Sequence, residues 1–189
     1  MRKRVGVLVS GRGSNMRALV EAARDPDYPA EIVCVVSNKP DTDGIDYAKA
    51  NGIATTVINH RAYPTREAFD AAVNDYLQFQ KINLVCCAGF MRIMTQVLIK
   101  PWEGRMLNIH PSLLPAYRGL HTHERAIKDG TKLAGCTVHF VTDELDGGPI
   151  IAQAAVPVLQ GDTGETLAAR VLEKEHALYV TALAMVAEG

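Results

Sequence analysis

RVGVLVSGRGSN, at residues 4–15, joins a short apolar run to a turn that contains two glycines. The run Arg4–Val9 is apolar enough to be buried on both faces of a sheet, and apolar residues at helical spacing follow over Asn15–Ala23. A strand, a glycine turn and a helix in this order are typical of a βαβ unit. The stretch therefore predicts an α/β fold whose first strand ends in a turn suited to ligand binding.

The same alternation of strand and helix patterns continues along the chain. Further buried strands are predicted at Glu31–Ser37, Thr55–Ile58, Asn83–Ala88 and Met106–Ile109. Helical spacing of apolar residues fills two of the intervals, Gly44–Asn51 and Arg66–Phe79. We therefore predict an open, mostly parallel, Rossmann-like sheet with helices on both faces.

The pattern changes in the last third of the chain. After a short predicted helix at Thr122–Lys128, two extended runs follow at Cys136–Val141 and Ile150–Val158, joined by a segment rich in turn residues. Two strands connected in this way indicate a hairpin or mixed-sheet extension. An amphipathic helix, Thr163–Val186, is expected to cover the sheet, with His176 among the residues that face it.

The overall composition favours small-molecule chemistry. The chain has 189 residues, 22% of them charged, and a formal net charge of −1. This balance indicates no nucleic-acid-binding surface, so we expect small-molecule substrates and no nucleic-acid partner. The apolar run Val5–Val9 is too short for a signal peptide or a membrane span, so we expect a cytoplasmic protein that does not enter membranes. We expect a monomer or a homodimer.

Four cysteines, Cys34, Cys86, Cys87 and Cys136, lie in apolar runs without C-x-x-C spacing. We expect them to be reduced and buried, and not to form disulfides or a zinc site. No set of three or four metal ligands stands at a recognisable spacing in the sequence, and we predict no metal.

The glycine turn itself, Ser10–Asn15, has two interpretations. Its backbone amides and the N-terminus of the following helix can hold a phosphate. The dinucleotide motif G-x-G-x-x-G requires a third glycine where this chain has Met16, and the Gly-Lys-Ser/Thr of the P-loop is missing too. The alternative is a structural turn in which the side chain of Ser14 or Asn15 caps the helix.

Three polar residues form a second candidate site. Asn108 and His110 lie two residues apart, and therefore on one face of the predicted strand, at the end where open α/β sheets bind ligands. Asp146 belongs to the turn DELDGGP at residues 143–149, from which its carboxylate can reach the histidine. Each residue also has a plainer interpretation, as a capping amide, a core histidine and a turn residue.

Several stretches of the sequence resemble the folate-dependent formyltransferases. These stretches are AGFMRI at residues 88–93, NIHPSLLP at 108–115 and TDELDGGP at 142–149. Two more, SGRGSN at 10–15 and GLHTH at 119–123, are similar to the members of this family that act on phosphoribosylglycinamide, and not to those that act on methionyl-tRNA.

The resemblance implies that residues 1–189 form a single formyltransferase domain. Its activity would be transfer of the formyl group of 10-formyltetrahydrofolate to the amine of 5′-phosphoribosylglycinamide, in de novo purine (IMP) biosynthesis. Asn108, His110 and Asp146 would be the catalytic residues. The amine would attack the formyl carbon directly, without an acyl-enzyme, while the amide and a protonated imidazole stabilise the oxyanion.

The same resemblance assigns the two binding sites. The site for phosphoribosylglycinamide would contain Gly13, Ser14, Asn15 and Glu175. The site for the folate would contain Arg66, Met91, Arg92, Ile93, Met94, Val141, Thr142, Asp143 and Glu144. Two other functions fit the same residues: a hydrolase that uses water in place of the amine, and a phosphosugar-binding module without catalysis.

Overall fold

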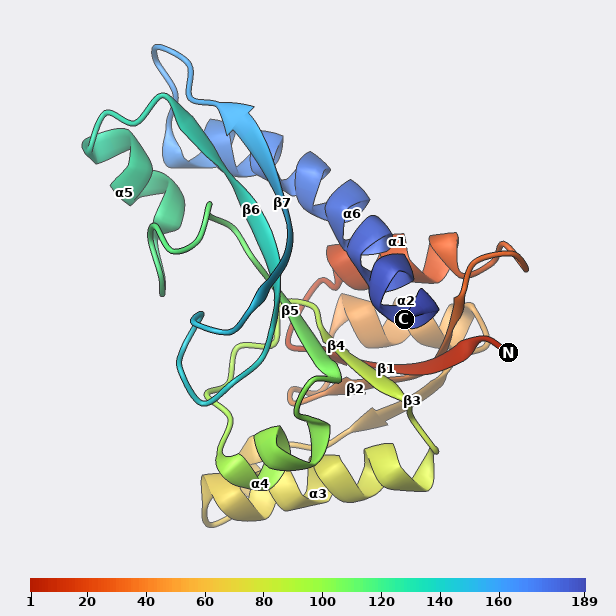
Figure 1. The fold of residues 1–189 in the computed structure, drawn as a ribbon. Coiled ribbons are helices and arrows are strands. Elements are labelled where there is room, and N and C mark those ends of the chain that lie inside the picture. The colour runs from red at the N-terminus through yellow and green to blue at the C-terminus, as the bar shows by residue number, and fades with distance from the viewer.

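The computed structural model describes residues 1–189, which fold around a seven-stranded sheet with the order β3-β2-β1-β4-β5-β6-β7 (Figure 1). The strands are β1 (Lys3–Val9), β2 (Ala30–Ser37), β3 (Ala54–Val57), β4 (Leu84–Cys87), β5 (Met106–His110), β6 (Leu133–Phe140) and β7 (Ile150–Pro157). The strands from β3 to β5 are parallel, whereas β6 is antiparallel to both β5 and β7. The predicted open α/β sheet with a mixed C-terminal extension is confirmed.

Helices cover both faces of the sheet, as predicted. They are α1 (Ser14–Ala22), α2 (Asp43–Ala50), α3 (Arg66–Phe79), α4 (Gln96–Ile99), α5 (Thr122–Lys128) and α6 (Gly164–Glu188), with 3-10 turns η1 (His60–Ala62) and η2 (Lys100–Trp102). Figure 1 shows α1, α2 and α6 on one side and α3 and α4 on the other. The sequence did not predict α4 or η2, because the segment is short and Pro101 interrupts it.

The central strand β1 supplies apolar side chains to both layers. Val5, Val7 and Val9 are fully buried against α1 and α6, and Leu8 is buried against α3. A Cβ atom at Gly6 would lie 2.8 Å from Leu77 Cδ2 of α3, so glycine allows α3 to pack closely on this strand. A strand buried on both faces explains the unbroken apolar run in the sequence.

The long helix α6 joins the two halves of the sheet. It begins with a capping box between Thr163 and Thr166. Its buried stripe includes Glu175 and Tyr179, and the Tyr179 hydroxyl donates to the Cys87 carbonyl of β4 at 2.8 Å. Of the residues expected to face the sheet, Leu167 and Val171 are fully buried, whereas His176 lies half-buried at the edge of the stripe.

The hairpin of β6 and β7 packs against α5 and the first half of α6 through Ala126, Cys136 and Leu167.

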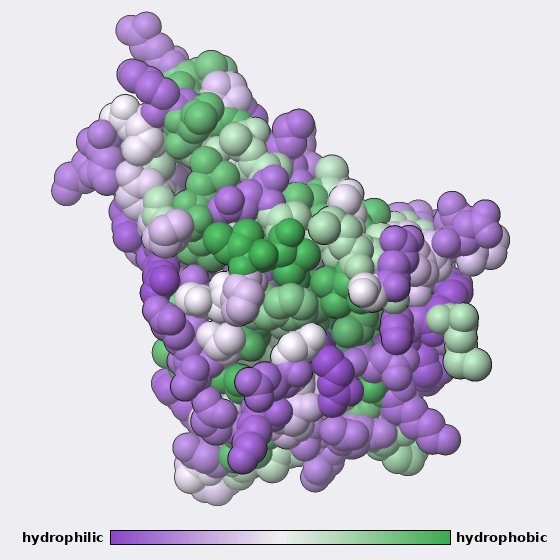
Figure 2. All heavy atoms as spheres, viewed as in Figure 1, coloured by the Kyte–Doolittle hydropathy of each residue, from purple (hydrophilic) through white to green (hydrophobic).

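Apolar side chains gather over β7 and α6 in Figure 2, and Ile150 and Met185 are among the exposed ones. None of the helices combines the length and the apolar character that crossing a membrane requires.

Candidate functional site

A cavity of about 320 Å³ opens at the carboxyl ends of β1 and β4. Its lining consists of Ser10–Asn15, Lys39, Ala88, Gly89 and Met91. The chain leaves β1 toward α1 on one face of the sheet and leaves β4 toward α4 on the other face, so the loops after these neighbouring strands diverge. A crevice at such a switch point is the usual ligand site of an open α/β sheet.

The turn after β1 presents backbone amides to this cavity. Gly13 has a left-handed backbone with φ of 69°, and the N-terminus of α1 has no side-chain cap. The Asn15 amide instead donates to Glu175 Oε1 at 3.2 Å, so the capping alternative for Ser14 and Asn15 is wrong. The first-turn amides of α1 therefore have the arrangement that an anion requires.

Lys39 adds a positive charge that sequence reasoning missed. It follows the end of β2 and lines the cavity together with Arg12. The glycine turn contains no lysine, and Lys39 is distant from it in sequence. Only the sheet order, which places β2 beside β1, brings this residue to the cavity.

Asn15 and Glu175 form a buried polar pair next to the cavity. Burial raises the pKa of Glu175, and the hydrogen bond from Asn15 partly offsets that rise. Asn15 Oδ1 is buried and has no hydrogen-bond partner in the protein. An acceptor in this state favours a ligand that brings an N–H or O–H donor.

Strand β5 directs Asn108 and His110 to the sheet face opposite α6, since the alternate residues Leu107 and Ile109 pack in the α6 core. In the parallel register Asn108 lies beside Cys87, the residue before cavity-lining Ala88. The two sequence motifs that begin at the carboxyl ends of β4 and β5 therefore meet at one end of the sheet.

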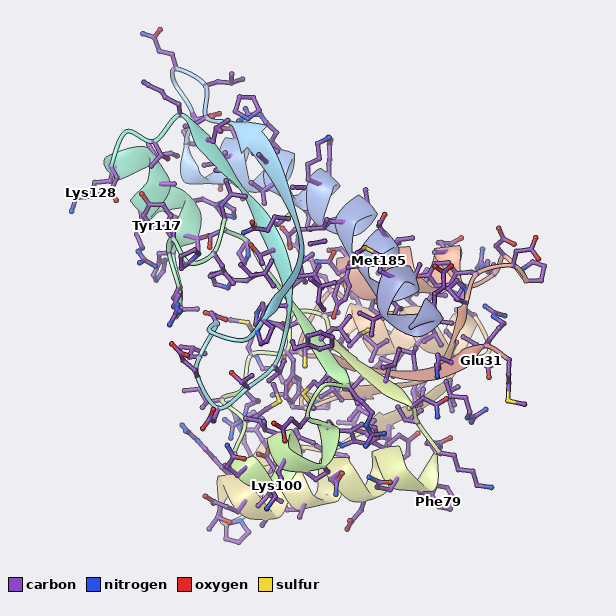
Figure 3. The ribbon with its side chains drawn as sticks, in the orientation of Figure 1. Glu31, Phe79, Lys100, Tyr117, Lys128 and Met185 are labelled. Carbon is purple, nitrogen blue, oxygen red and sulfur yellow. The ribbon has the colours of Figure 1, made fainter.

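His110 lies between a carbonyl and a carboxylate, with 6% of its surface exposed. Its Nε2 is 2.8 Å from the Tyr117 carbonyl oxygen, and its Nδ1 is 3.5 Å from Asp146 Oδ2. Figure 3 labels Tyr117 on the loop beside α5. Each ring nitrogen of His110 therefore faces a group that only accepts hydrogen bonds.

The position of Asp146 depends on two loops. The residue has a left-handed backbone with φ of 51°, and its Oδ2 also accepts the Gly119 N–H at 2.9 Å. Arg118 and Glu144 form an ion pair between the same two loops. Asp146 is thus brought to His110 by contacts between segments that are distant in sequence.

His139 of β6 is a further polar neighbour that the sequence did not reveal. It pairs with Asn108 across the antiparallel ladder, and Asn108 Nδ2 lies 3.4 Å from His139 Nε2. His139 Nδ1 lies 2.9 Å from the Phe140 carbonyl, which must accept, so Nε2 is left to accept from Asn108. Burial lowers the pKa of His139, which favours this neutral form.

The residues expected to hold a folate are distributed over two loops that meet. Val141 packs in the same apolar cluster as Met94, whereas Met91 and Ile93 expose 63% and 60% of their surface. The Arg92 guanidinium lies 5.6 Å from the centre of the Phe69 ring and so faces α3. The remaining expected residues, Arg66, Thr142, Asp143 and Glu144, are half-buried or exposed near these loops.

The structure contains no group of three or more His, Cys, Asp or Glu side chains arranged to hold a metal ion. The four cysteines are buried and unpaired. Burial raises the pKa of Cys86 and of Cys136 to about 12. Neither thiol is therefore available as a nucleophile near neutral pH.

The fold, the glycine turn and the buried polar residues together form a small-molecule site at the strand ends of an α/β sheet. A family model described as formyl transferase matches residues 3–183, and the chain belongs to this family. Among its relatives, the phosphoribosylglycinamide formyltransferase of Escherichia coli is 44% identical over 183 residues, which cover 97% of this chain and 86% of that protein.

A solved structure and a longer relative give the same picture. The crystal structure of phosphoribosylglycinamide formyltransferase from Brucella melitensis superposes with a TM-score of 0.96 at 54% identity, covering 100% of this chain and 97% of that one. The trifunctional purine biosynthetic protein adenosine-3 of Bos taurus is 50% identical over 186 residues. The chain spans only 18% of the length of that protein.

Proposed function

We propose that residues 1–189 act as one catalytic domain that transfers the formyl group of 10-formyltetrahydrofolate to the amine of 5′-phosphoribosylglycinamide, a step of de novo purine biosynthesis. The observation that carries the proposal is the contact of buried His110 with Asp146, next to Asn108 and one strand away from the cavity that the glycine turn lines. The names of the relatives at 44% to 54% identity support the choice of substrates.

The substrate phosphate binds at the turn after β1. Backbone amides of Gly13, Ser14 and Asn15 donate to its oxygens, and Lys39 adds charge at the rim of the cavity. The ribose or glycinamide end of the substrate extends toward the Asn15–Glu175 pair, where the unpartnered Asn15 Oδ1 accepts a hydrogen bond from it. This anchoring sets the distance from the phosphate to the reacting amine.

The folate lies between the segment that follows β4 and the loop that follows β6. Exposed Met91 and Ile93 offer apolar surface to the flat pterin. Met94 and Val141 form the floor, and Thr142, Asp143 and Glu144 form the edge, of this site. Arg66, exposed at the start of α3, is placed to meet the glutamate carboxylates, whereas Arg92 acts by packing on Phe69.

The reaction is a direct attack of the amine on the formyl carbon. As the C–N bond forms, the formyl oxygen becomes an oxyanion, which the Asn108 amide and His110 stabilise. Because Nε2 faces Tyr117 and the Nδ1–Asp146 distance of 3.5 Å is long for a hydrogen bond, Nδ1–H is the proton that His110 presents. Asp146 stabilises the imidazolium by charge.

The tetrahedral species collapses by breaking the bond between the formyl carbon and N10 of the folate. N10 takes up a proton and the attacking nitrogen loses one, so the reaction needs no further reactant. A covalent formyl-enzyme is not required. The Ser112 hydroxyl donates to the Ala116 carbonyl at 2.6 Å and has no adjacent base, and the cysteine thiols are buried.

A formyl-transfer assay with a panel of amines tests this proposal. With 10-formyltetrahydrofolate and 5′-phosphoribosylglycinamide together we expect release of tetrahydrofolate and of formylated product in equal amounts. Turnover at the same rate with water alone would identify a hydrolase instead. Binding of the phosphoribosyl amine without any turnover, unchanged in His110→Asn, would identify a binding module.

A further inference from the structure

One buried hydroxyl connects the ends of three neighbouring strands. Ser10, the first residue after β1, is 5% exposed. Its Oγ donates to Oδ1 of Asn38, which follows β2, at 2.6 Å. The same Oγ accepts the backbone N–H of Met91, beyond β4, at 2.8 Å.

The partner on the β2 side is itself held in place. Asn38 is 1% exposed, and its Nδ2 lies 3.2 Å from His60 Nδ1 in η1. The same His60 Nδ1 lies 3.2 Å from the Asn38 carbonyl oxygen, so His60 contacts both the side chain and the backbone of Asn38. The Ser10 hydroxyl donates to Asn38 Oδ1, which leaves its oxygen lone pairs to accept from the Met91 N–H.

Side chains of Phe90, Arg92 and Met94 pack toward α3, but the backbone of segment 89–94 makes few hydrogen bonds. Its last ladder contact before the turn is the Ala88 N–H to the Leu8 carbonyl at 2.9 Å, and no backbone–backbone hydrogen bond involves residues 89–94. Beyond the segment, the Thr95 N–H and hydroxyl both donate to buried Asp70 of α3. The Met91–Ser10 bond is thus the contact that ties this segment to the phosphate turn.

We propose that Ser10 is a positioning residue that sets the folate-facing segment 89–94 at a fixed distance from the phosphate turn, which starts at Gly11. The inference rests on the proposed function, because it assigns the two ligands to these two segments. The Ser10 hydroxyl holds the Met91 backbone directly, so the distance between segment 89–94 and the phosphate turn does not depend on the conformation of the exposed Gly89. Correct spacing matters, since small displacements of bound reactants lower transfer rates.

Ser10→Ala tests the assignment. Without the hydroxyl, the Met91 N–H and Asn38 Oδ1 lose their partner, and the segment moves to positions where water satisfies them. Only part of the population then has the binding-competent arrangement, so KM for 10-formyltetrahydrofolate rises by about tenfold. Saturating folate selects that arrangement again, so kcat falls by less than about threefold.

Ser37→Ala is the matched control. Ser37 is also a buried serine at the end of a strand, but its hydroxyl bonds only to the backbone of Lys39 in its own turn. We expect this variant to keep the KM for 10-formyltetrahydrofolate. Calorimetric titration with 5′-phosphoribosylglycinamide, without folate, should give affinities within about twofold of the original protein for Ser10→Ala, because the turn amides are retained.

An unchanged KM for folate in Ser10→Ala would overturn the positioning role. So would an equal loss of affinity for both ligands, because that result would show general damage at the strand ends. If the original protein binds both ligands but transfers no formyl group, the proposed function fails. The folate affinity of Ser10→Ala, measured by the same titration with 10-formyltetrahydrofolate, then tests the positioning role separately.

Discussion

The parallel part of the sheet and the antiparallel hairpin contribute to the candidate site in different ways. At the ends of β1 and β4 the contributions are mainly backbone groups of a local turn, which fold with the strand that precedes them. The hairpin of β6 and β7 contributes side chains, His139 and Asp146, that act by touching β5 residues. Under the proposed function, phosphate binding therefore depends on local backbone shape, whereas the chemistry depends on contacts between distant segments.

The largest effect is expected at Asp146, in the loop of the antiparallel hairpin. Asp146→Asn keeps the size of the side chain and removes the charge next to His110, so we expect kcat to fall by about a hundredfold. The affinity for 5′-phosphoribosylglycinamide should stay the same, because the phosphate turn belongs to the parallel part. Asp75→Asn, at an exposed position on α3, is the control and should keep full activity.

Gly13→Ala tests the parallel part of the sheet, where the turn after β1 is proposed to bind phosphate. A Cβ atom there would lie 3.2 Å from Gly44 Cα, on a backbone with φ of 69°, so the turn must change shape. We expect the dissociation constant of 5′-phosphoribosylglycinamide, measured by calorimetry, to rise by about tenfold or more, with folate affinity retained.

Gly52→Ala separates backbone strain from loss of the binding site. Gly52 has φ of 71° and open space around its Cβ position, at the end of α2. We expect each glycine variant to lose about 1 to 2 kcal/mol of stability, because both glycines have a left-handed backbone. Gly52→Ala should nevertheless keep its substrate affinity. Equal affinity losses in the two glycine variants would mean that the turn after β1 has no special role.

A smaller effect is expected at His139. His139→Phe removes the acceptor that orients the Asn108 amide, and we expect kcat to fall by about fivefold while both KM values stay unchanged. His139→Gln keeps an acceptor and should recover most of that loss. If the Phe and Gln variants show the same kcat, the contact with Asn108 does not orient the amide.

The lowered pKa of His139 also predicts that the protein becomes less stable in mild acid. Because burial lowers its pKa in the folded protein, the unfolded chain binds more protons below about pH 6.5, so the free energy of unfolding decreases as the pH falls. Urea unfolding at neutral and mildly acidic pH should show a smaller decrease for His139→Phe than for the original protein. Burial also lowers the pKa values of His123 and His176, so part of the decrease should persist.

The smallest effect is expected at Lys39. Lys39→Ala removes a charge at the rim of the cavity, where solvent screens it, so the affinity for 5′-phosphoribosylglycinamide should fall by about threefold and depend less on salt. Lys49→Ala, exposed on α2, is the matched control. An identical salt dependence in the two variants would remove Lys39 from the phosphate site.

Local patterns were sufficient to predict most of the fold. β1, its glycine turn and α1 follow directly from composition and spacing, and the hairpin follows from two extended runs around a turn. The roles of Lys39 and His139 could not be predicted, because they depend on strand order and on the Asn108–His139 register. Glu175, which the resemblance assigns to the substrate site, is buried beside Asn15, whereas His176 is rotated from it by about 100° around the helix and is half-buried.

The most direct test of the account follows an isotopic label in the formyl group during a single turnover with enzyme in excess. We expect the label to pass from 10-formyltetrahydrofolate to 5′-phosphoribosylglycinamide without ever being bound to protein, and His110→Asn to slow this one step. Label retained on the quenched protein, or released as formate at the same rate without the amine, would contradict direct transfer.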